Sequence, residues 1–168
     1  GDYAGDGKDE QTDEQRYIAN DDVYALEFDK DGVLQHVVSD LHFTDNNAQG
    51  KAERTLEGTL VPLEGKITLA VLANLKQNGI SDALEMLKGK IGDSKQEVYE
   101  SLIYTYPTSE WDVTQRYLPM HGEVTTTLAS QITNLNCNIY RGVAKMGVKN
   151  SAGNFTLKEI YVYYVNTQ

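Results

Sequence analysis

The C-terminal stretch, residues 139–166, constrains the fold more than any other part of this sequence. Between residues 139 and 149, small and apolar residues alternate with the basic residues Arg141, Lys145 and Lys149. This period of two is typical of a half-buried β-strand. Residues 155–165 also alternate but become apolar on both faces from Ile160 onward, as in a strand covered on both sides. The intervening Asn-Ser-Ala-Gly-Asn sequence favours a turn, so the stretch predicts a β-hairpin within a sheet.

The acidic charge of the chain is concentrated at its N-terminus. Residues 1–22 carry a net charge of −6 out of −10 for all 168 residues, and residues 1–16 have few apolar side chains. We therefore predict a flexible acidic tail at residues 1–21 and one folded domain at residues 22–168, with order beginning near Val23. The acidic balance disfavours nucleic acid as a partner. No apolar run reaches the roughly 18 residues that a membrane helix requires.

Further strands are expected upstream of the C-terminal hairpin. Residues 23–38 form two apolar runs around an Asp-Gly pair, which predicts a second β-hairpin. Residues 66–74 are apolar on both faces and predict a central strand. Residues 39–58 are polar and predict a loop, with Leu41 and Phe43 as anchors, and the Thr-rich residues 123–129 predict another strand.

Two short helices should interrupt the strands. The first covers residues 80–91 with Ser81 as its N-cap. Its apolar face would consist of Ile80, Leu84, Leu87 and Ile91. The second begins at a Ser-x-x-Glu capping box, Ser94 and Glu97, and buries Val98 and Leu102. This order of elements predicts a mainly-β protein, a β-sandwich with a short two-helix insertion.

Motifs for catalysis are absent from the sequence. It contains no Gly-rich phosphate loop, no Gly-x-Ser-x-Gly elbow and no His-Glu-x-x-His pair. We therefore expect no enzyme activity and no cofactor. The single Cys137 cannot form an internal disulfide and is expected to be a small buried hydrophobe.

Metal-binding patterns are weak. His36 and His42 could share a metal ion, but solvated or hydrogen-bonded histidines are favoured, so no metal site is predicted. The Asp29–Gly32 sequence resembles the start of a calcium loop. The position that needs glycine is Leu34, however, and the position of the bidentate glutamate is Asp40. A hairpin turn is the favoured interpretation.

An aromatic cluster is the remaining candidate site. Trp111, with Tyr104, Tyr106 and Tyr117, could form a platform on which a sugar ring stacks. The same residues could instead pack a loop over the sandwich, and this second interpretation is favoured.

Three stretches of the chain together resemble the N-terminal domain of the fimbrillins, the type V pilins of Gram-negative gut and oral bacteria. They are a strand ending in Ala-Asn before a helix (residues 66–74), a Pro-Met-x-Gly-Glu strand (119–123), and the Arg-x-Val-Ala-Lys strand followed by Phe-x-Leu and Tyr-Val-Tyr (141–163). Their order and spacing are similar to the family's over residues 22–168. The resemblance implies a transthyretin-like Greek-key sandwich of about seven strands. It also implies a further C-terminal sandwich, so that this chain corresponds to one domain of a longer precursor.

The resemblance further implies an exported lipoprotein at the cell surface or outer membrane, anchored to the membrane only by a lipid outside this chain. In fimbrillins a protease removes an N-terminal segment after an Arg, and a strand from another fimbrial subunit fills the opened groove. Arg16 matches the position of that cut. Residues 1–15 are more polar than a removed strand, which leaves open a different closure of the groove, or an unprocessed anchor, tip or accessory subunit.

The expected function is therefore a structural or adhesive subunit of fimbriae that assembles by β-strand addition. The alternative is a surface-tethered module that binds a glycan or protein of a host or bacterial surface through the aromatic loop.

Overall fold

The computed structural model describes residues 17–45, 47, 49–51, 53–105, 117–128, 132–141 and 155–164. Within these residues the chain forms one eight-stranded sheet and two α-helices. The strands are β1 (Val23–Phe28), β2 (Leu34–Val37), β3 (His42–Phe43), β4 (Glu53–Leu60), β5 (Lys66–Ala73), β6 (Met120–Thr127), β7 (Ile132–Arg141) and β8 (Phe155–Tyr164). The helices are α1 (Ala83–Lys88) and α2 (Lys95–Thr105), preceded by a short 3₁₀ helix at Lys76–Asn78. The predicted mainly-β class is confirmed.

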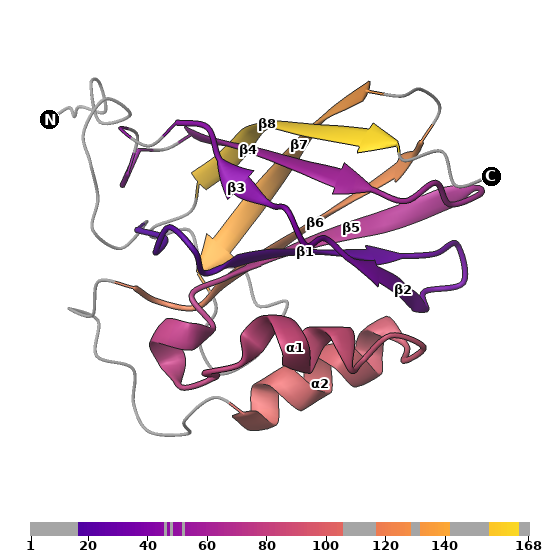
Figure 1. The fold of residues 1–168 in the computed structure, drawn as a ribbon, viewed down its shortest axis with the longest axis horizontal. Coiled ribbons are helices and arrows are strands. Elements are labelled where there is room, and N and C mark those ends of the chain that lie inside the picture. Colours follow the sequence, from indigo (N-terminus) through magenta and orange to yellow (C-terminus); the bar gives the residue numbers. More distant parts are fainter. Residues whose placement is uncertain are drawn as a thin grey trace, which may run out of the picture.

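The sheet folds over itself into two layers. The strand order is β2-β1-β5-β6-β7-β8-β4-β3, and all neighbours are antiparallel except the parallel pair β4 and β8. Strand β7 joins the layers, because its end pairs with β6 while the rest pairs with β8. Figure 1 shows β7 crossing between the layer of β1, β2 and β5 and the layer of β3, β4 and β8.

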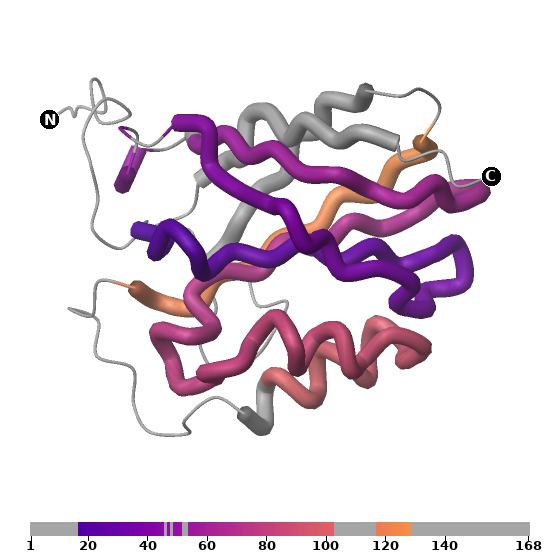
Figure 2. The backbone as a smooth tube through the Cα atoms, viewed as in Figure 1, coloured from indigo at the N-terminus to yellow at the C-terminus, as the bar shows by residue number. Residues whose placement is uncertain are grey.

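The layer of β1 and β5 is buried on both faces. Alternate residues such as Val23 and Ala25 of β1 pack between the two layers, against Leu56 and Leu60 of β4. The intervening residues of β1 and β5 pack with α1 and α2, which cover the outer face (Figures 1 and 2). The prediction of a central strand at residues 66–74 is therefore confirmed: β5 lies between β1 and β6, and it is apolar on both faces because both are covered.

The first hairpin and the second helix form as predicted. Strands β1 and β2 pair around a turn in which Asp29 Oδ1 accepts hydrogen bonds from the backbone N–H groups of Asp31 and Val33, each at 2.9 Å. In the capping box of α2, Ser94 N–H donates to Glu97 Oε1 at 2.9 Å and Glu97 N–H donates to Ser94 Oγ at 3.1 Å.

The first helix departs from the prediction. Helix α1 spans only Ala83–Lys88, its N-cap is Asp82 rather than Ser81, and no side chain caps it. Because α1 ends before Gly89, Ile91 does not reach the predicted apolar face and is 48% exposed. The short helix is held by its packing against β2 and α2 rather than by its caps.

The loop predicted at residues 39–58 is wrong, because β3 and most of β4 lie there. The buried face of β4 includes Arg54 and Gly58 beside Leu56 and Leu60, so its apolar alternation is hidden in the sequence. A Cβ atom on Gly58 would lie 3.0 Å from side-chain atoms of Leu41 and Val38, so glycine allows the close approach of the β2–β3 connection.

The C-terminal hairpin has a different first strand from the predicted one. Residues 155–163 pair with residues 132–139, while residues 142–154 lie outside the described part of the chain. The Asn-rich sequence of β7 has low β propensity, which concealed it as a strand. The side chain of Cys137 also lies outside the described part. Strand β6 begins at Met120, earlier than the predicted residue 123.

Candidate functional site

Strand addition requires a sheet edge whose backbone groups are unpaired, so the edges are the places where the predicted function can be tested against geometry. The terminal strands of the sheet are β2 and β3. Strand β3 has only two residues, which pair with Leu56 and Glu57 of β4. Most of the edge of β4 is therefore not covered by β3.

Carboxylate side chains close the edge of β4 on either side of β3. Asp45 Oδ2 accepts a hydrogen bond from Thr55 N–H at 2.7 Å, and Asp40 Oδ1 accepts one from Thr59 N–H at 2.9 Å. Burial alone would raise the pKa of Asp40, but the hydrogen bonds from Thr59 outweigh burial and hold this pKa below its ordinary value. These carboxylates occupy the positions that the backbone of an added strand would need.

A third carboxylate, Glu27, seals the end of the same edge from the opposite layer. Its Oε1 accepts a hydrogen bond from Val61 N–H at 2.9 Å and lies 2.7 Å from His36 Nδ1. Glu27 is fully buried, and among the described residues its Oε2 has no hydrogen-bond partner. Burial raises the pKa of Glu27, against the opposing effect of His36. Glu27 thus links β1, β2 and the end of β4 through one carboxyl group.

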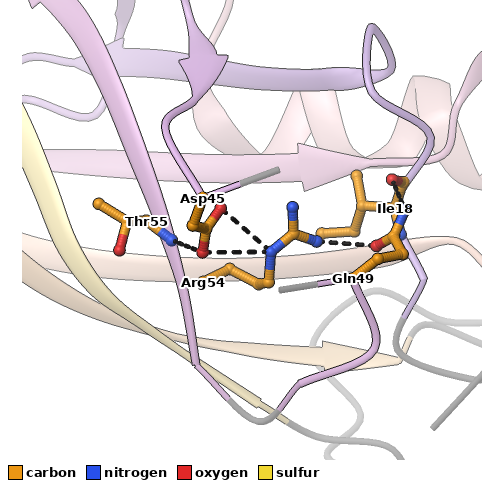
Figure 3. A network of polar contacts seen from close by, with 5 residues as sticks. All are labelled: Ile18, Asp45, Gln49, Arg54 and Thr55. Atoms are coloured by element: carbon orange, nitrogen blue, oxygen red, sulfur yellow. Dashed lines mark hydrogen bonds and ion pairs between the residues drawn. The ribbon is translucent and has the colours of Figure 1, made fainter. Parts of the chain in front are cut away.

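A buried arginine supports this closed edge. Arg54 is 1% exposed, and its guanidinium carbon lies 3.9 Å from the centre of the Phe43 ring. Its Nε lies 3.3 Å from both carboxylate oxygens of Asp45, and its Nη1 donates to Gln49 Oε1 at 2.8 Å (Figure 3). Gln49 also exchanges two hydrogen bonds with the backbone of Ile18, at 3.0 and 2.7 Å. The chain ahead of β1 is therefore held to the same network, and Ile18 is buried in the core between the layers.

Asn74 holds the other side of this N-terminal segment. It has a positive φ of 64°, and its Oδ1 accepts from Ala19 N–H at 3.0 Å. Its Nδ2 donates to the carbonyl oxygens of Tyr17 and Leu118, each at 2.8 Å. Asn74 thus joins two of the stretches that resemble fimbrillins. It ends the Ala-Asn stretch (residues 66–74) and binds Leu118, the residue directly before the Pro-Met stretch (residues 119–123).

The edge of β1 is different, because β2 ends before β1 does. The last contact between them is the hydrogen bond from Val38 N–H to Ala25 O at 2.9 Å, and no described residue pairs with Val23 on this side. A groove of about 330 Å³ lies there; we call it the β1 groove. It is lined by Asp21, Val23, Tyr24, Val38, Ser39, Leu41, Lys76, Ser81, Asp82, Ala83, Leu84 and Glu85.

The lining of the β1 groove combines buried apolar residues with exposed acidic ones. We call the buried residues Val23, Tyr24, Val38 and Ala83 its floor, and the acidic residues Asp21, Asp82 and Glu85 its rim. Three carboxylates line it against one ammonium group. Lys76 Nζ lies 3.0 Å from Asp21 Oδ2, which lowers the pKa of that carboxyl. The sequence offered no signal for this groove, since its residues come from four separate segments.

The predicted aromatic platform and the predicted cleavage site lie largely outside the described residues. Arg16, Tyr106 and Trp111 lie outside the described residues, as does the side chain of Tyr104, whose backbone belongs to α2. Tyr117 is half-buried, and its ring centre lies 6.4 Å from that of Tyr17. Asn78 Nδ2 donates to the backbone carbonyl of Tyr117 at 2.9 Å. The aromatic loop therefore stays a prediction.

The described residues show neither a metal cluster nor a membrane-spanning helix. In the described part of the chain, no three His, Cys, Asp or Glu side chains lie close enough together to hold a metal ion. His42 lies 3.3 Å from Glu57, and His36 contacts Glu27 instead. No helix within the described ranges is long and apolar enough to span a membrane.

No protein-family model, curated protein or solved structure matches the chain. The resemblance to fimbrillins therefore rests on the three sequence stretches alone.

Proposed function

We propose that this domain is a structural or adhesive subunit of cell-surface fimbriae and that it assembles with other subunits by β-strand addition. The observation that carries the proposal is the β1 groove, where no described residue pairs with Val23 at the edge of β1 and buried apolar residues form part of the lining. An added strand would satisfy the backbone of β1 and cover apolar side chains in one step. The sequence stretches that resemble fimbrillins support the same proposal.

The contrast between the two edges adds support. A subunit that adds one strand at one place must keep its remaining edges from pairing at random. The edge of β4 is occupied by Asp40, Asp45 and Glu27, while no side chain in the described part of the chain is hydrogen-bonded to the backbone of Val23. An edge of β4 that carboxylates close, beside an edge of β1 that stays open at Val23, favours addition of a strand at β1 rather than at β4.

The remaining parts of the proposal follow from the resemblance. They are a transthyretin-like Greek-key connection of the strands, export, a lipid anchor outside this chain, a location at the cell surface or outer membrane, and cleavage after Arg16.

The test uses the full-length precursor, because the resemblance places the donor strand outside the present 168 residues. Each precursor molecule can then supply a strand to its neighbour. The precursor is treated with a low dose of trypsin, the new N-terminus is identified by mass spectrometry, and unboiled samples are run on a denaturing gel. Cleavage after Arg16 with a ladder of detergent-resistant oligomers is the expected result. A chain that stays monomeric after cleavage contradicts assembly by strand addition.

A further inference from the structure

The β1 groove follows the edge of a strand rather than one face of it. Val23 and Tyr24 are consecutive in β1, so their side chains point to opposite faces of the sheet, yet both line the groove. Only a groove that runs along the strand edge touches both. An extended peptide lying beside β1 would therefore contact both residues.

The backbone of β1 can pair with such a peptide. Asn74 N–H donates to Asp22 O at 2.8 Å on the β5 side, and hydrogen-bonded positions alternate along an antiparallel pair. Val23, the next residue, therefore turns its N–H and C=O groups to the opposite side, towards the groove. Ala25 does the same and accepts the bond from Val38 N–H. A strand added at Val23 would extend the pairing along this edge of β1 by one residue pair beyond the end of β2.

The charge of the rim selects the partner. The lining carries three carboxylates and one lysine. Asp21 lies 3.0 Å from Lys76 and Glu85 lies 3.2 Å from Lys88 outside the lining, while among the described residues Asp82 has no ion-pair partner. An acidic peptide would be repelled. Residues 1–15 of this chain carry six acidic side chains and one lysine, so their charge does not complement the groove. A lysine or arginine side chain can lay its apolar stem on the floor and place its charge at the rim.

We propose that the β1 groove binds an extended protein segment in which basic side chains alternate with small apolar ones, paired through its backbone with Val23. This inference rests on the proposed function, since both involve strand addition, but it specifies the position and the charge of the added strand.

A peptide-binding experiment tests the inference with the whole 168-residue chain. The probe is a fluorescein-labelled peptide with the sequence of residues 140–149, which alternates Arg141, Lys145 and Lys149 with small and apolar residues. A matched peptide has serine at these three positions. Binding is measured by fluorescence anisotropy, and we expect the basic peptide to bind about three- to tenfold more tightly, the scale of one or two exposed ion pairs.

Variants of the chain locate the binding. Asp82→Asn with Glu85→Gln should weaken binding of the basic peptide by about three- to tenfold and leave the serine peptide unchanged. The control pair, Asp31→Asn with Glu64→Gln, removes the same charge outside the groove and should leave the affinity within about twofold. Ser39→Trp fills the groove and should abolish binding of both peptides. Circular dichroism checks that each variant is folded.

Equal affinity for the two peptides, or equal effects of the groove and control pairs, overturns the assignment of a basic partner. Failure of both peptides to bind overturns the β1 groove as the acceptor. Neither result decides the proposed function, which is judged separately by the oligomer ladder of the full-length precursor.

Discussion

The short terminal strands β2 and β3 leave part of the edges of β1 and β4 uncovered, and these two edges differ. Along β4, the N–H groups of Thr55 and Thr59 on either side of β3 are bonded to carboxylates, and the buried Arg54 contacts one of these carboxylates, Asp45. Along β1, the pairing with β2 stops and a groove lined by apolar and acidic side chains is left. A side chain that accepts the hydrogen bonds of an edge blocks strand pairing there, even though no full strand covers the edge. A groove beside an unpaired edge leaves room for a further strand to pair. A closed edge and an open edge thus require different residues. Four variants test how much the residues around the closed edge and the N-terminal segment contribute to stability.

The largest effect is expected at Arg54, because it is the buried centre of the closed edge. Arg54→Met keeps much of the volume but leaves Asp45 and Gln49 without their partner. Breaking a buried ion pair costs about 3–5 kcal/mol, so we expect a loss of about 3 kcal/mol in the free energy of unfolding, since Asp45 is partly exposed. Urea denaturation measures it. Lys66→Met at the exposed start of β5 is the control, with a change within about 0.5 kcal/mol. Equal effects would show that Arg54 does not support the edge.

Asn74 comes next, because it ties the N-terminal segment to both β5 and the start of β6. Asn74→Gly keeps the positive φ accessible and removes only the side-chain hydrogen bonds. Leaving buried backbone groups unsatisfied should cost about 2–3 kcal/mol, again measured in urea. Asn20→Gly, at an exposed turn next to this segment, is the matched control. If Asn74→Gly is no worse than the control, water replaces these bonds and the segment is not anchored by Asn74.

Replacement of Glu27 should stabilise the protein at neutral pH. Burial raises its folded pKa above the unfolded value of about 4.3. Its contribution to stability is therefore complete below about pH 4 and is lost as the pH rises through the raised folded pKa. Glu27→Gln keeps an oxygen for Val61 N–H but no charge, so it should be more stable than the native chain at pH 7 by about 1 kcal/mol.

The measurement for Glu27 is urea denaturation at several pH values between 4 and 8. The advantage of Glu27→Gln should shrink towards pH 4, where the native glutamate is protonated. Glu64→Gln, at an exposed position, should show no such trend. A constant difference between Glu27→Gln and the native chain at every pH would contradict a raised pKa.

The smallest effect on stability should come from Asp40. Asp40→Ala removes the acceptor of Thr59 N–H at an exposed position, so we expect a loss of about 0.5–1 kcal/mol. Because the folded pKa of Asp40 is lowered, this contribution is present at neutral pH and disappears below about pH 4. Ser39→Ala in the β1 groove should change stability by less than about 0.5 kcal/mol. If the two variants are equally stable at pH 7, the carboxylate does not close the edge of β4.

Several elements were predictable from sequence because their patterns are local. The first hairpin follows from apolar runs around an Asp-Gly turn, and the capping box of α2 depends on residues three positions apart. The double-faced apolar pattern of β5 correctly predicted a strand covered on both sides. The mainly-β class followed from these elements together.

By itself, then, the sequence determined the secondary structure of the first hairpin, of α2 and of β5. Their apolar periodicity and capping residues are patterns that extend over only a few positions. Only the tertiary structure decided how the edges differ. Arg54 and Gly58 face the interior because Phe43, Asp45 and Val38 lie there, and the β1 groove exists because β2 ends beside α1. Such contacts join residues far apart in the chain, so no local pattern encodes them.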